Sequence, residues 1–277
     1  MEKYSVLMSV YYKEKPEYLE LAIESMLNQT VLPDEILIVK DGDITNELQN
    51  ILDKYKQKHE NRFTIVGYKE NKGLAYALNY GLNRCRNNLV ARMDSDDYSL
   101  PLRCELQLKV IEKNPEISLV GTGIGFFEKT PKEPLDKFKY YPDNIEDMKQ
   151  MIRRNSAFAH VSVMYKRDVV LSIGGYDSKL RLGQDQDLFS KMIYKGVQAF
   201  NINKELVLVR SDQSLKLRRK NKESCRSRII VQKRLLKRKQ CNIIDFLIIY
   251  SSVLIVRIMP EKVFLKVYSL LKENKKK

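Results

Sequence analysis

Apolar runs of two periodicities alternate along the first 120 residues, and this alternation limits the possible folds more than any other feature. Short runs rich in β-branched and other apolar residues predict strands at residues 4–12, 35–40, 63–68, 89–93 and 117–122. Between them, apolar side chains recur at helical spacing in residues 16–29, 45–57, 74–82 and 102–114. Strands that alternate with helices predict an α/β fold, in which a mostly parallel sheet carries helices on both faces.

Aspartates follow two of these predicted strands. Asp41 ends the second strand, and Asp94, Asp96 and Asp97 follow the fourth in "ARMDSDD". Ligands of parallel sheets bind at the carboxyl ends of the strands, so these acids are expected around one crevice. Asp94 and Asp96 lie on the same side of an extended backbone, and carboxylate oxygens suit Mg²⁺ or Mn²⁺. The alternative is an acidic turn that caps the helix at Leu102, and spacing alone leaves both interpretations open.

The middle of the chain, residues 123–215, is less regular. The run "FAHVSVMYKR" at residues 158–167 is typical of a strand. Residues 172–196 predict a loop that leads into a helix, whose apolar side includes Leu188 and Met192.

Seven motifs occur in the order of a known family. They are "SVLMSVYYKEKPEYLELAIESMLNQT", "LIVKDG", "ENKGLAYALNYGL", "ARMDSDD", "HVSVM", "GGY" and "QDQDL". As a set they resemble family 2 glycosyltransferases of the Rossmann-like GT-A fold, and "VKDGDITNEL" is similar to the amylovoran-type branch of capsule and exopolysaccharide synthesis. The resemblance covers residues 1–215, the expected catalytic domain, with a nucleotide-sugar half at about 1–122 and an acceptor half at about 123–215.

The resemblance implies that the first half binds a nucleotide-diphosphate sugar, usually one that carries uracil. It implies a hydrogen bond between Asp41 and the nucleobase, beside Tyr11 at the end of the first strand. Lys72 and Gly73, in "NKG", are implied to line the nucleotide. Asn71 either caps a turn or reaches the nucleotide.

By the same resemblance, Asp96 holds the Mn²⁺ or Mg²⁺ that bridges the diphosphate, and Asp94 shares the metal or contacts the ribose. Asp185 corresponds to the general base that takes the proton of an acceptor hydroxyl, which makes the transfer inverting. The leaving diphosphate develops negative charge that a cation stabilises, and one carboxylate suffices as base. Without the resemblance, the preferred interpretation of Asp185 is an acid that stabilises a helix N-terminus.

Three further residues are candidate contacts to the donor or acceptor sugar. His160 either faces the sugar or is a structural residue in an apolar strand, and Gly175 either permits a tight turn or lets backbone approach a ligand. Gln184 stands where the commoner family pattern has Glu, and Lys40 stands where that pattern has an acid. These two departures bear on acceptor orientation and on nucleobase contacts.

The formal net charge of +15 is concentrated towards the C-terminus. Residues 1–209 contain 30 basic and 30 acidic side chains, whereas residues 210–240 contain 13 basic and two acidic ones. Residues 216–277 are therefore predicted to form a basic, amphipathic helical tail, and an anionic surface is expected to meet the protein through residues 210–277.

Residues 243–259 of the tail are apolar, without charge from Phe246 to Val256. A membrane span needs about 20 apolar residues, so this shorter segment predicts a helix that lies in the membrane interface. Flanking Lys and Arg side chains would be attracted to anionic lipid and would bring the enzyme to a lipid-linked oligosaccharide acceptor. The alternative is a helix that packs on the catalytic domain with a solvated basic side.

Four widely spaced cysteines without a C-x-x-C pair suit a cytoplasmic protein, here expected at the inner face of the cell membrane. The competing function is a nucleic-acid-binding or catalytically degenerate GT-A-like protein that acts through its basic tail. The tail lacks interleaved aromatic residues before Phe246, and the acids would then be unexplained, so no nucleic-acid partner is expected. A sugar nucleotidyltransferase would have a similar sheet, but the glycine-rich loop of that class does not follow the first strand.

Overall fold

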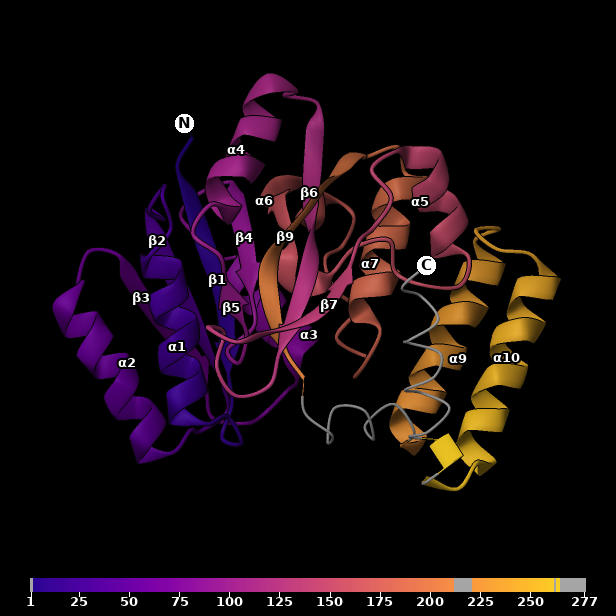
Figure 1. The fold of residues 1–277 in the computed structure, drawn as a ribbon, viewed down its shortest axis with the longest axis horizontal. Helices are drawn as coiled ribbons and strands as arrows, with labels where there is room; N and C mark the ends of the chain where they lie inside the picture. Colours follow the sequence, from indigo (N-terminus) through magenta and orange to yellow (C-terminus); the bar gives the residue numbers. More distant parts are fainter. Residues whose placement is uncertain (1, 212–220, 262, 265–277) are drawn as a thin grey trace.

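One mixed sheet runs through the computed structural model, which describes residues 2–211, 221–261, 263 and 264 (Figure 1). The strand order is β3-β2-β1-β4-β8-β6-β9-β5, with β7 paired to β6. The strands are β1 (Tyr4–Val10), β2 (Glu35–Asp41), β3 (Phe63–Tyr68), β4 (Leu89–Met93), β5 (Tyr98–Ser99), β6 (Ile117–Phe127), β7 (Pro134–Lys139), β8 (Met164–Lys166) and β9 (Gln198–Arg210). The helices are α1 (Pro16–Leu27), α2 (Asn46–Lys58), α3 (Leu74–Leu82), α4 (Arg103–Lys113), α5 (Ile145–Ile152), α6 (Arg167–Ser172), α7 (Gln184–Tyr194), α9 (Lys222–Lys237) and α10 (Ile243–Ile258).

Four strands that the sequence predicted, β1 to β4, form a parallel half of the sheet. β1 pairs in parallel with β2 and β4, and β2 pairs in parallel with β3. Val6 and Met8 of β1 join an apolar layer with α1, α2 and α4, whereas Leu7 joins the opposite layer with α3 and α7. Burial on both faces explains the continuous apolar runs, and the expected helices on both faces are confirmed. The parallel direction brings the carboxyl ends of β1, β2 and β4 to one edge of the sheet.

The sequence at the start of α1 and of α2 explains why each helix begins where it does. Pro16 is the first residue of α1, where its missing N–H would have had no partner within the helix. Thr45 caps α2, and its hydroxyl accepts a hydrogen bond from the backbone N–H of Leu48 at 3.4 Å.

The second half of the sheet was only partly predicted. The strand expected at residues 117–122 is β6, which continues to Phe127 and pairs in parallel with β9, a strand that the sequence reasoning missed. The prediction of a strand through residues 158–167 is wrong for its first part. His160–Ser162 forms a 3₁₀ turn, and only Met164–Lys166 forms a strand, β8. β8 is antiparallel to both β4 and β6, so the sheet is mixed here.

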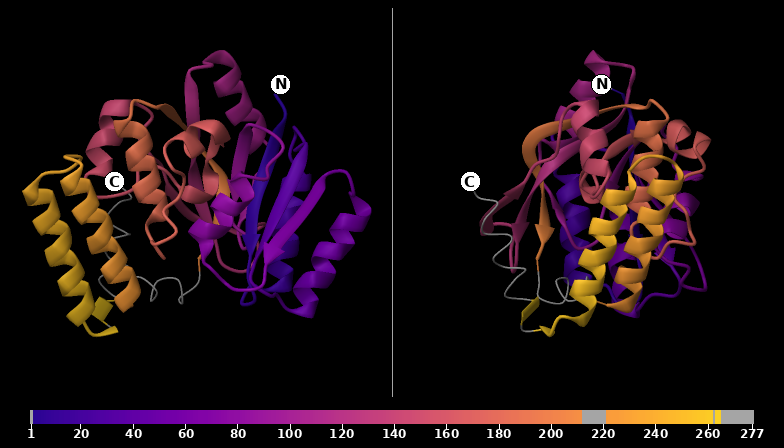
Figure 2. Two further views of the ribbon diagram at one scale, coloured as in Figure 1. Left: turned by 180° about the vertical axis from the view of Figure 1, so that it is seen from behind. Right: turned by 90° about the vertical axis from the view of Figure 1, so that its right-hand side faces the viewer.

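The described part of the predicted C-terminal tail is mostly helical, as expected, and residues 216–220, 262 and 265–277 of that tail lie outside the described residues. α9 packs against α7, and α10 lies on the outer side of α9 (Figures 1 and 2). Val231 and Leu235 of α9 are buried in the same apolar cluster as the core of the catalytic domain. Ile249 and Val253 of α10 are buried with Cys225 of α9 in a separate cluster. Within the described residues, no helix has both the length and the apolar character needed to cross a membrane.

Candidate active site

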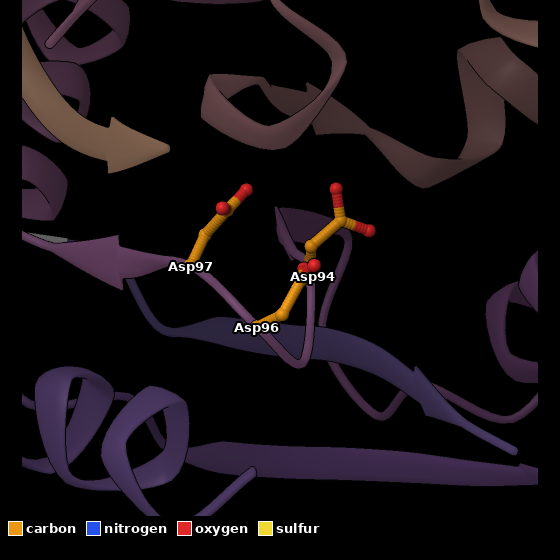
Figure 3. A group of neighbouring side chains, drawn as sticks. All are labelled: Asp94, Asp96 and Asp97. Atoms are coloured by element: carbon orange, nitrogen blue, oxygen red, sulfur yellow. The ribbon is translucent and has the colours of Figure 1, made fainter. Parts of the chain in front are cut away.

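Three aspartates, Asp94, Asp96 and Asp97, form what we call the acidic cluster, in the turn between β4 and β5 (Figure 3). Each offers a carboxylate oxygen, and these oxygens all lie within 4.8 Å of one another. Asp97 is buried, and the other two are half-buried. Hard oxygen donors at this separation suit a Mg²⁺ or Mn²⁺ ion, so the residues present fit the expected cation.

Arg92 binds Asp94 from within the sheet. Its side chain is 1% exposed, and its two terminal nitrogens donate to the two carboxylate oxygens of Asp94, one of them at 2.6 Å. A strand places residues i and i+2 on the same side, which makes this bidentate pair possible. The sequence reasoning missed Arg92, although a charged residue inside the apolar run "LVARM" is a signal that a buried partner is near.

Arg210, the last residue of β9, connects this distant strand to the acidic cluster. Its backbone N–H donates to the Asp97 carboxylate at 2.8 Å, and its Nε donates to the backbone oxygen of Asp96 at 3.1 Å. Its guanidinium carbon lies 3.6 Å from the centre of the Tyr18 ring. No local sequence signal marks Arg210, because its partners in the acidic cluster lie more than 100 residues away in the chain.

The acidic cluster holds more negative charge than its surroundings offset. Burial raises the pKa of Asp96 to about 7, with further contributions from the charges of Asp94 and Glu14. Burial, followed by the charge of Asp96, raises the pKa of Asp97 well above its usual range. Glu14, which sequence reasoning also missed, follows β1 and accepts a hydrogen bond from the Ser95 hydroxyl. A bound cation would reverse this repulsion, which is the electrostatic condition of a metal site.

Asp41, at the end of β2, fixes the loop that follows β3. Its carboxylate accepts hydrogen bonds from the Tyr68 hydroxyl at 2.9 Å and the Asn71 amide at 3.0 Å. It also accepts from the backbone N–H groups of Lys72 at 2.7 Å and Gly73 at 3.0 Å. The structure therefore brings Asp41 together with the "NKG" residues, and both carboxylate oxygens already have protein donors.

Tyr11 and Lys72, two of the predicted nucleotide contacts, are exposed at the surface. Tyr11 follows β1 and is 37% exposed. The Lys72 ammonium lies 5.7 Å from the Tyr68 ring centre and 4.9 Å from that of Tyr76. Gly73, with a φ of 89°, adopts a backbone conformation that favours glycine, directly before α3.

Asp185 lies in the first turn of α7, after Gly183 in the left-handed conformation. Burial raises the pKa of Asp185, while hydrogen bonds from the backbone N–H groups of Gln186 and Asp185 lower it. The charges of Arg92 and Asp94 also contribute to the pKa of Asp185, so the acidic cluster lies within electrostatic range of this carboxyl. The neighbouring Gln184 is buried, and its Oε1 has no hydrogen-bond partner among the described residues.

His160 and Gly175 have partners within the protein. His160 Nε2 lies 2.9 Å from the Tyr176 hydroxyl, and burial holds the pKa of His160 well below its usual value, so the ring is neutral. Gly175 has a φ of 62°, and a Cβ there would lie 2.5 Å from Oδ1 of Asn79. This packing requires glycine. Sugar contacts of the two residues stay predictions.

The sequence is similar to known glycosyltransferases over most of its length. The family model "Glycosyl transferase family 2" matches residues 5–174. The amylovoran biosynthesis glycosyltransferase AmsE of Erwinia amylovora is 34% identical over 96% of this chain and 97% of its own length. The UDP-Gal:alpha-D-GlcNAc-diphosphoundecaprenol beta-1,3-galactosyltransferase of Escherichia coli is 32% identical over 93% of this chain and 92% of its own.

Solved structures share the fold at low sequence identity. S. aureus TarS 1–349 in complex with UDP-GlcNAc has a TM-score of 0.66 at 16% identity, over 85% of this chain and 67% of that chain. The mannosyltransferase PcManGT of Pyrobaculum calidifontis, in complex with GDP-Man and Mn²⁺, has a TM-score of 0.63 at 15% identity, over 85% and 64%.

Proposed function

Because this chain belongs to glycosyltransferase family 2 and has the GT-A fold, we propose that it transfers one sugar from a nucleotide-diphosphate donor to a hydroxyl of a lipid-linked glycan. The transfer inverts the anomeric configuration and serves the synthesis of a surface polysaccharide. The observation that carries the proposal is the acidic cluster, three carboxylates at the end of β4 whose oxygens lie within 4.8 Å of one another. The proposed domain division is 1–215 for catalysis, as halves 1–122 and 123–215, and 216–277 for the tail.

The acidic cluster is proposed to hold Mn²⁺ or Mg²⁺ through Asp94 and Asp96, with Asp97 beside them. When bound, the cation supplies positive charge against the diphosphate that leaves. The protein contributes the fixed geometry. Arg92 orients Asp94, and Arg210 holds Asp97 through its backbone N–H. These contacts keep three mutually repelling carboxylates in place before the donor arrives.

Asp185 is proposed as the general base. Burial raises the pKa of its carboxyl, which makes the ionised form a stronger base than an exposed aspartate. The two backbone N–H groups at the start of α7 keep the carboxylate oriented. As the acceptor oxygen attacks the anomeric carbon from the face opposite the diphosphate, its proton passes to Asp185, and the bond to the diphosphate breaks. No covalent bond to the enzyme is needed.

The donor is proposed to be a UDP-sugar, bound along Tyr11, Asp41, Asn71, Lys72 and Gly73. The name of the Escherichia coli relative includes UDP-Gal, and TarS was solved with UDP-GlcNAc, which supports uracil. Asp41 already accepts hydrogen bonds from the "NKG" loop, so in this proposal it shapes the nucleotide site and also contacts the base. His160, Gly175 and Gln184 are proposed near the sugars, and the unpaired Oε1 of Gln184 is the best supported of these contacts.

The acceptor is proposed to be a lipid-linked oligosaccharide at the inner face of the cell membrane. The diphosphoundecaprenol acceptor in the name of the Escherichia coli relative supports this class of molecule. A lipid-linked acceptor requires the enzyme to work at a membrane surface. The basic residues of 210–277 would then attract the protein to anionic lipid.

Thermal unfolding with nucleotides tests the donor and metal parts of the proposal. We expect UDP to raise the melting temperature only when Mn²⁺ is present, because a ligand that binds the native state stabilises it. GDP, dTDP and CMP are the comparison ligands. Asp96→Asn should reduce the apparent Mn²⁺ affinity at least about tenfold, because a carboxylate ligand is lost.

Asp53→Asn is the matched control, since Asp53 is an exposed acid on α2. It should bind nucleotide and Mn²⁺ like the unchanged protein. A melting temperature that none of the nucleotides raises would contradict the proposal. Unchanged Mn²⁺ dependence in Asp96→Asn would remove Asp96 from the metal site.

A further inference from the structure

The outward face of α10 is apolar along its whole length. The buried side chains Asp245, Ile249 and Val253, four residues apart, lie on the side that faces α9 and the catalytic domain. The opposite side exposes large apolar residues, each between 38% and 80% exposed: Ile243, Ile244, Leu247, Ile248, Tyr250, Leu254, Ile255 and Ile258. The helix has 16 residues, so this face extends for about 24 Å. An apolar patch of this size on a protein surface marks an interaction site.

A groove between α9 and α10 combines an apolar lining with a basic rim. Its volume is about 480 Å³, and its lining includes Ile229 of α9 and Val253 of α10. Within the described part of the chain, none of the rim cations makes an ion pair or a hydrogen bond. They are Lys222, Arg226, Lys233 and Arg257. An apolar groove with free cations at its edge suits an amphipathic anion.

The groove lies towards the same end of the molecule as the carboxyl end of β9. In Figure 1, β9 ends, α9 begins and α10 ends in the lower part of the molecule. The last residue of β9, Arg210, contacts the acidic cluster. A membrane or other surface that binds the start of α9 and the end of α10 therefore lies at the same end of the molecule as the acidic cluster.

We propose that α9 and α10 dock on an anionic phospholipid bilayer. The apolar face of α10 enters the lipid–water interface, and the four rim cations bind lipid phosphates while the groove takes part of an acyl chain. This inference deepens the proposed function, on which it rests for its biological role. A nucleic acid would meet the cations but leave the apolar face in water. A second copy of the chain would bring an identical set of four cations to the first, and like charges repel.

Vesicle flotation of the full chain tests the inference, with phosphatidylcholine vesicles that contain or lack phosphatidylglycerol. The rim variant is Arg226→Gln/Lys233→Gln/Arg257→Gln, and the face variant is Leu247→Gln/Ile255→Gln. The matched controls are Lys58→Gln/Lys113→Gln/Lys132→Gln, at exposed lysines of other elements, and Leu32→Gln, at a leucine that is 48% exposed. All replaced residues are exposed, so each variant is expected to fold.

The unchanged protein should float with phosphatidylglycerol vesicles, and less well without that lipid or in high salt. The rim variant should lose affinity for phosphatidylglycerol vesicles about fivefold per cation. The face variant should lose affinity for both vesicles about tenfold, and the controls should bind like the unchanged protein. Absence of flotation, or variants that float unchanged, would overturn the inference. The inference would also be overturned if the unchanged protein were a dimer, and if the face variant were a monomer that binds vesicles as well as the unchanged protein does.

Transfer to a water-soluble acceptor separates this inference from the proposed function. The rim and face variants should transfer sugar to it at the rate of the unchanged protein, because none of their residues lies in the proposed active site. If the protein floats with vesicles but transfers no sugar, the proposed function fails and the docking surface stands. If it transfers sugar to the soluble acceptor but does not bind vesicles, only the docking surface fails.

Discussion

Asp185 and the acidic cluster are carboxylates with different surroundings, which suit different roles. Burial is the largest cause of the raised pKa of Asp96, Asp97 and Asp185, but the charge of a neighbouring carboxylate is the next cause only for Asp96 and Asp97. The cluster therefore suits metal binding, and Asp185 suits proton transfer. Two backbone N–H groups fix the Asp185 carboxylate, as a base that must meet one hydroxyl requires.

Asp185→Asn should remove proton transfer and leave donor binding. We expect kcat to fall about 10²- to 10⁴-fold, the usual contribution of a general base, with the Kd for the UDP-sugar changed less than about twofold. Steady-state transfer rates and titration calorimetry measure the two effects. Asp168→Asn, at an exposed acid of α6, is the control. A variant that loses donor binding together with transfer would exclude Asp185 from the role of base.

His160 should make the folded protein less stable in acid. Its pKa is held well below the usual 6.5 in the folded state by burial, so the unfolded state binds more protons below that pH. The free energy of unfolding should fall as pH drops below 6.5, by up to about 2 kcal/mol from this residue at pH 5. The variant His160→Gln has no group that titrates at this position, so it should lack this pH-dependent contribution to the free energy of unfolding.

Urea unfolding of both proteins at pH 7.5 and pH 5 measures that contribution. At pH 7.5 histidine is neutral in both states, so the difference between the proteins there reports the lost contacts of the imidazole with Tyr176 and Phe189. Relative to the unchanged protein, the variant should gain stability at pH 5. An equal difference at both pH values would show that His160 is protonated as easily in the folded protein as in the unfolded one.

At the scale of elements, α9 is attached to α7, the helix that carries Asp185. Asp187 of α7 is buried, and its carboxylate pairs with Arg234 of α9 at 3.6 Å and with Arg238, the residue that follows α9, at 2.8 Å. Arg234 also pairs with Asp177, in the loop before α7, at 2.7 Å. Asp185 and Asp187 thus both lie in the first turn of α7 but have different partners. The tail is part of the support of the proposed catalytic helix.

Asp187→Asn should destabilise the protein by about 2 kcal/mol, because it removes the carboxylate that pairs with the partly buried Arg238 and leaves Arg234 with Asp177 alone. Urea unfolding at neutral pH measures the change. Glu105→Gln is the matched control. Its pair with Lys109 lies on the surface of α4, and its loss should cost less than about 0.5 kcal/mol. Equal losses in the two variants would mean that the α7–α9 contact contributes no more than a surface ion pair.

Local periodicity predicted the elements of the first half well. The helix at 74–82 and the strand at 89–93 match α3 and β4 to the residue, because their apolar patterns arise from their own burial. β9 was missed because polar residues such as Asn201 and Glu205 interrupt its pattern, and its place in the sheet depends on pairing with β6 far away in the chain. The region of His160 was mistaken for a strand because a buried turn is as apolar as a strand.

In the candidate site, too, some residues could be predicted from the local sequence and others only from the folded structure. Asp94, Asp96 and Asp185 could be singled out from strand ends and family motifs, and the family and enzyme class so predicted are confirmed. Glu14 and Arg210 could not be found, because only the folded chain brings them to the cluster. Whether each predicted site residue contacts donor, metal or acceptor stays a prediction.

At the scale of the whole molecule, chemistry and charge occupy different parts. The charge-balanced body contains the acidic cluster, whereas the excess of +15 comes from the C-terminal extension. One helix of this extension packs on the body of the protein, and the other has an exposed face. α9 joins the main core, and α10 presents an apolar face outwards. The two alternatives weighed for the tail, packing on the body and binding of membrane, are therefore compatible in one structure.

The account's central claim is sugar transfer with inversion, and a product assay tests it most directly. The purified chain would be incubated with Mn²⁺, a diphosphate-lipid-linked monosaccharide and, in turn, UDP-Gal, UDP-GlcNAc and GDP-Man. Mass spectrometry would count added sugars, and NMR would give the anomeric configuration. We predict a single added sugar from one UDP-sugar, with the configuration opposite to that of the donor and no product after chelation of the metal. A product with retained configuration, or no product from any donor, would contradict the account.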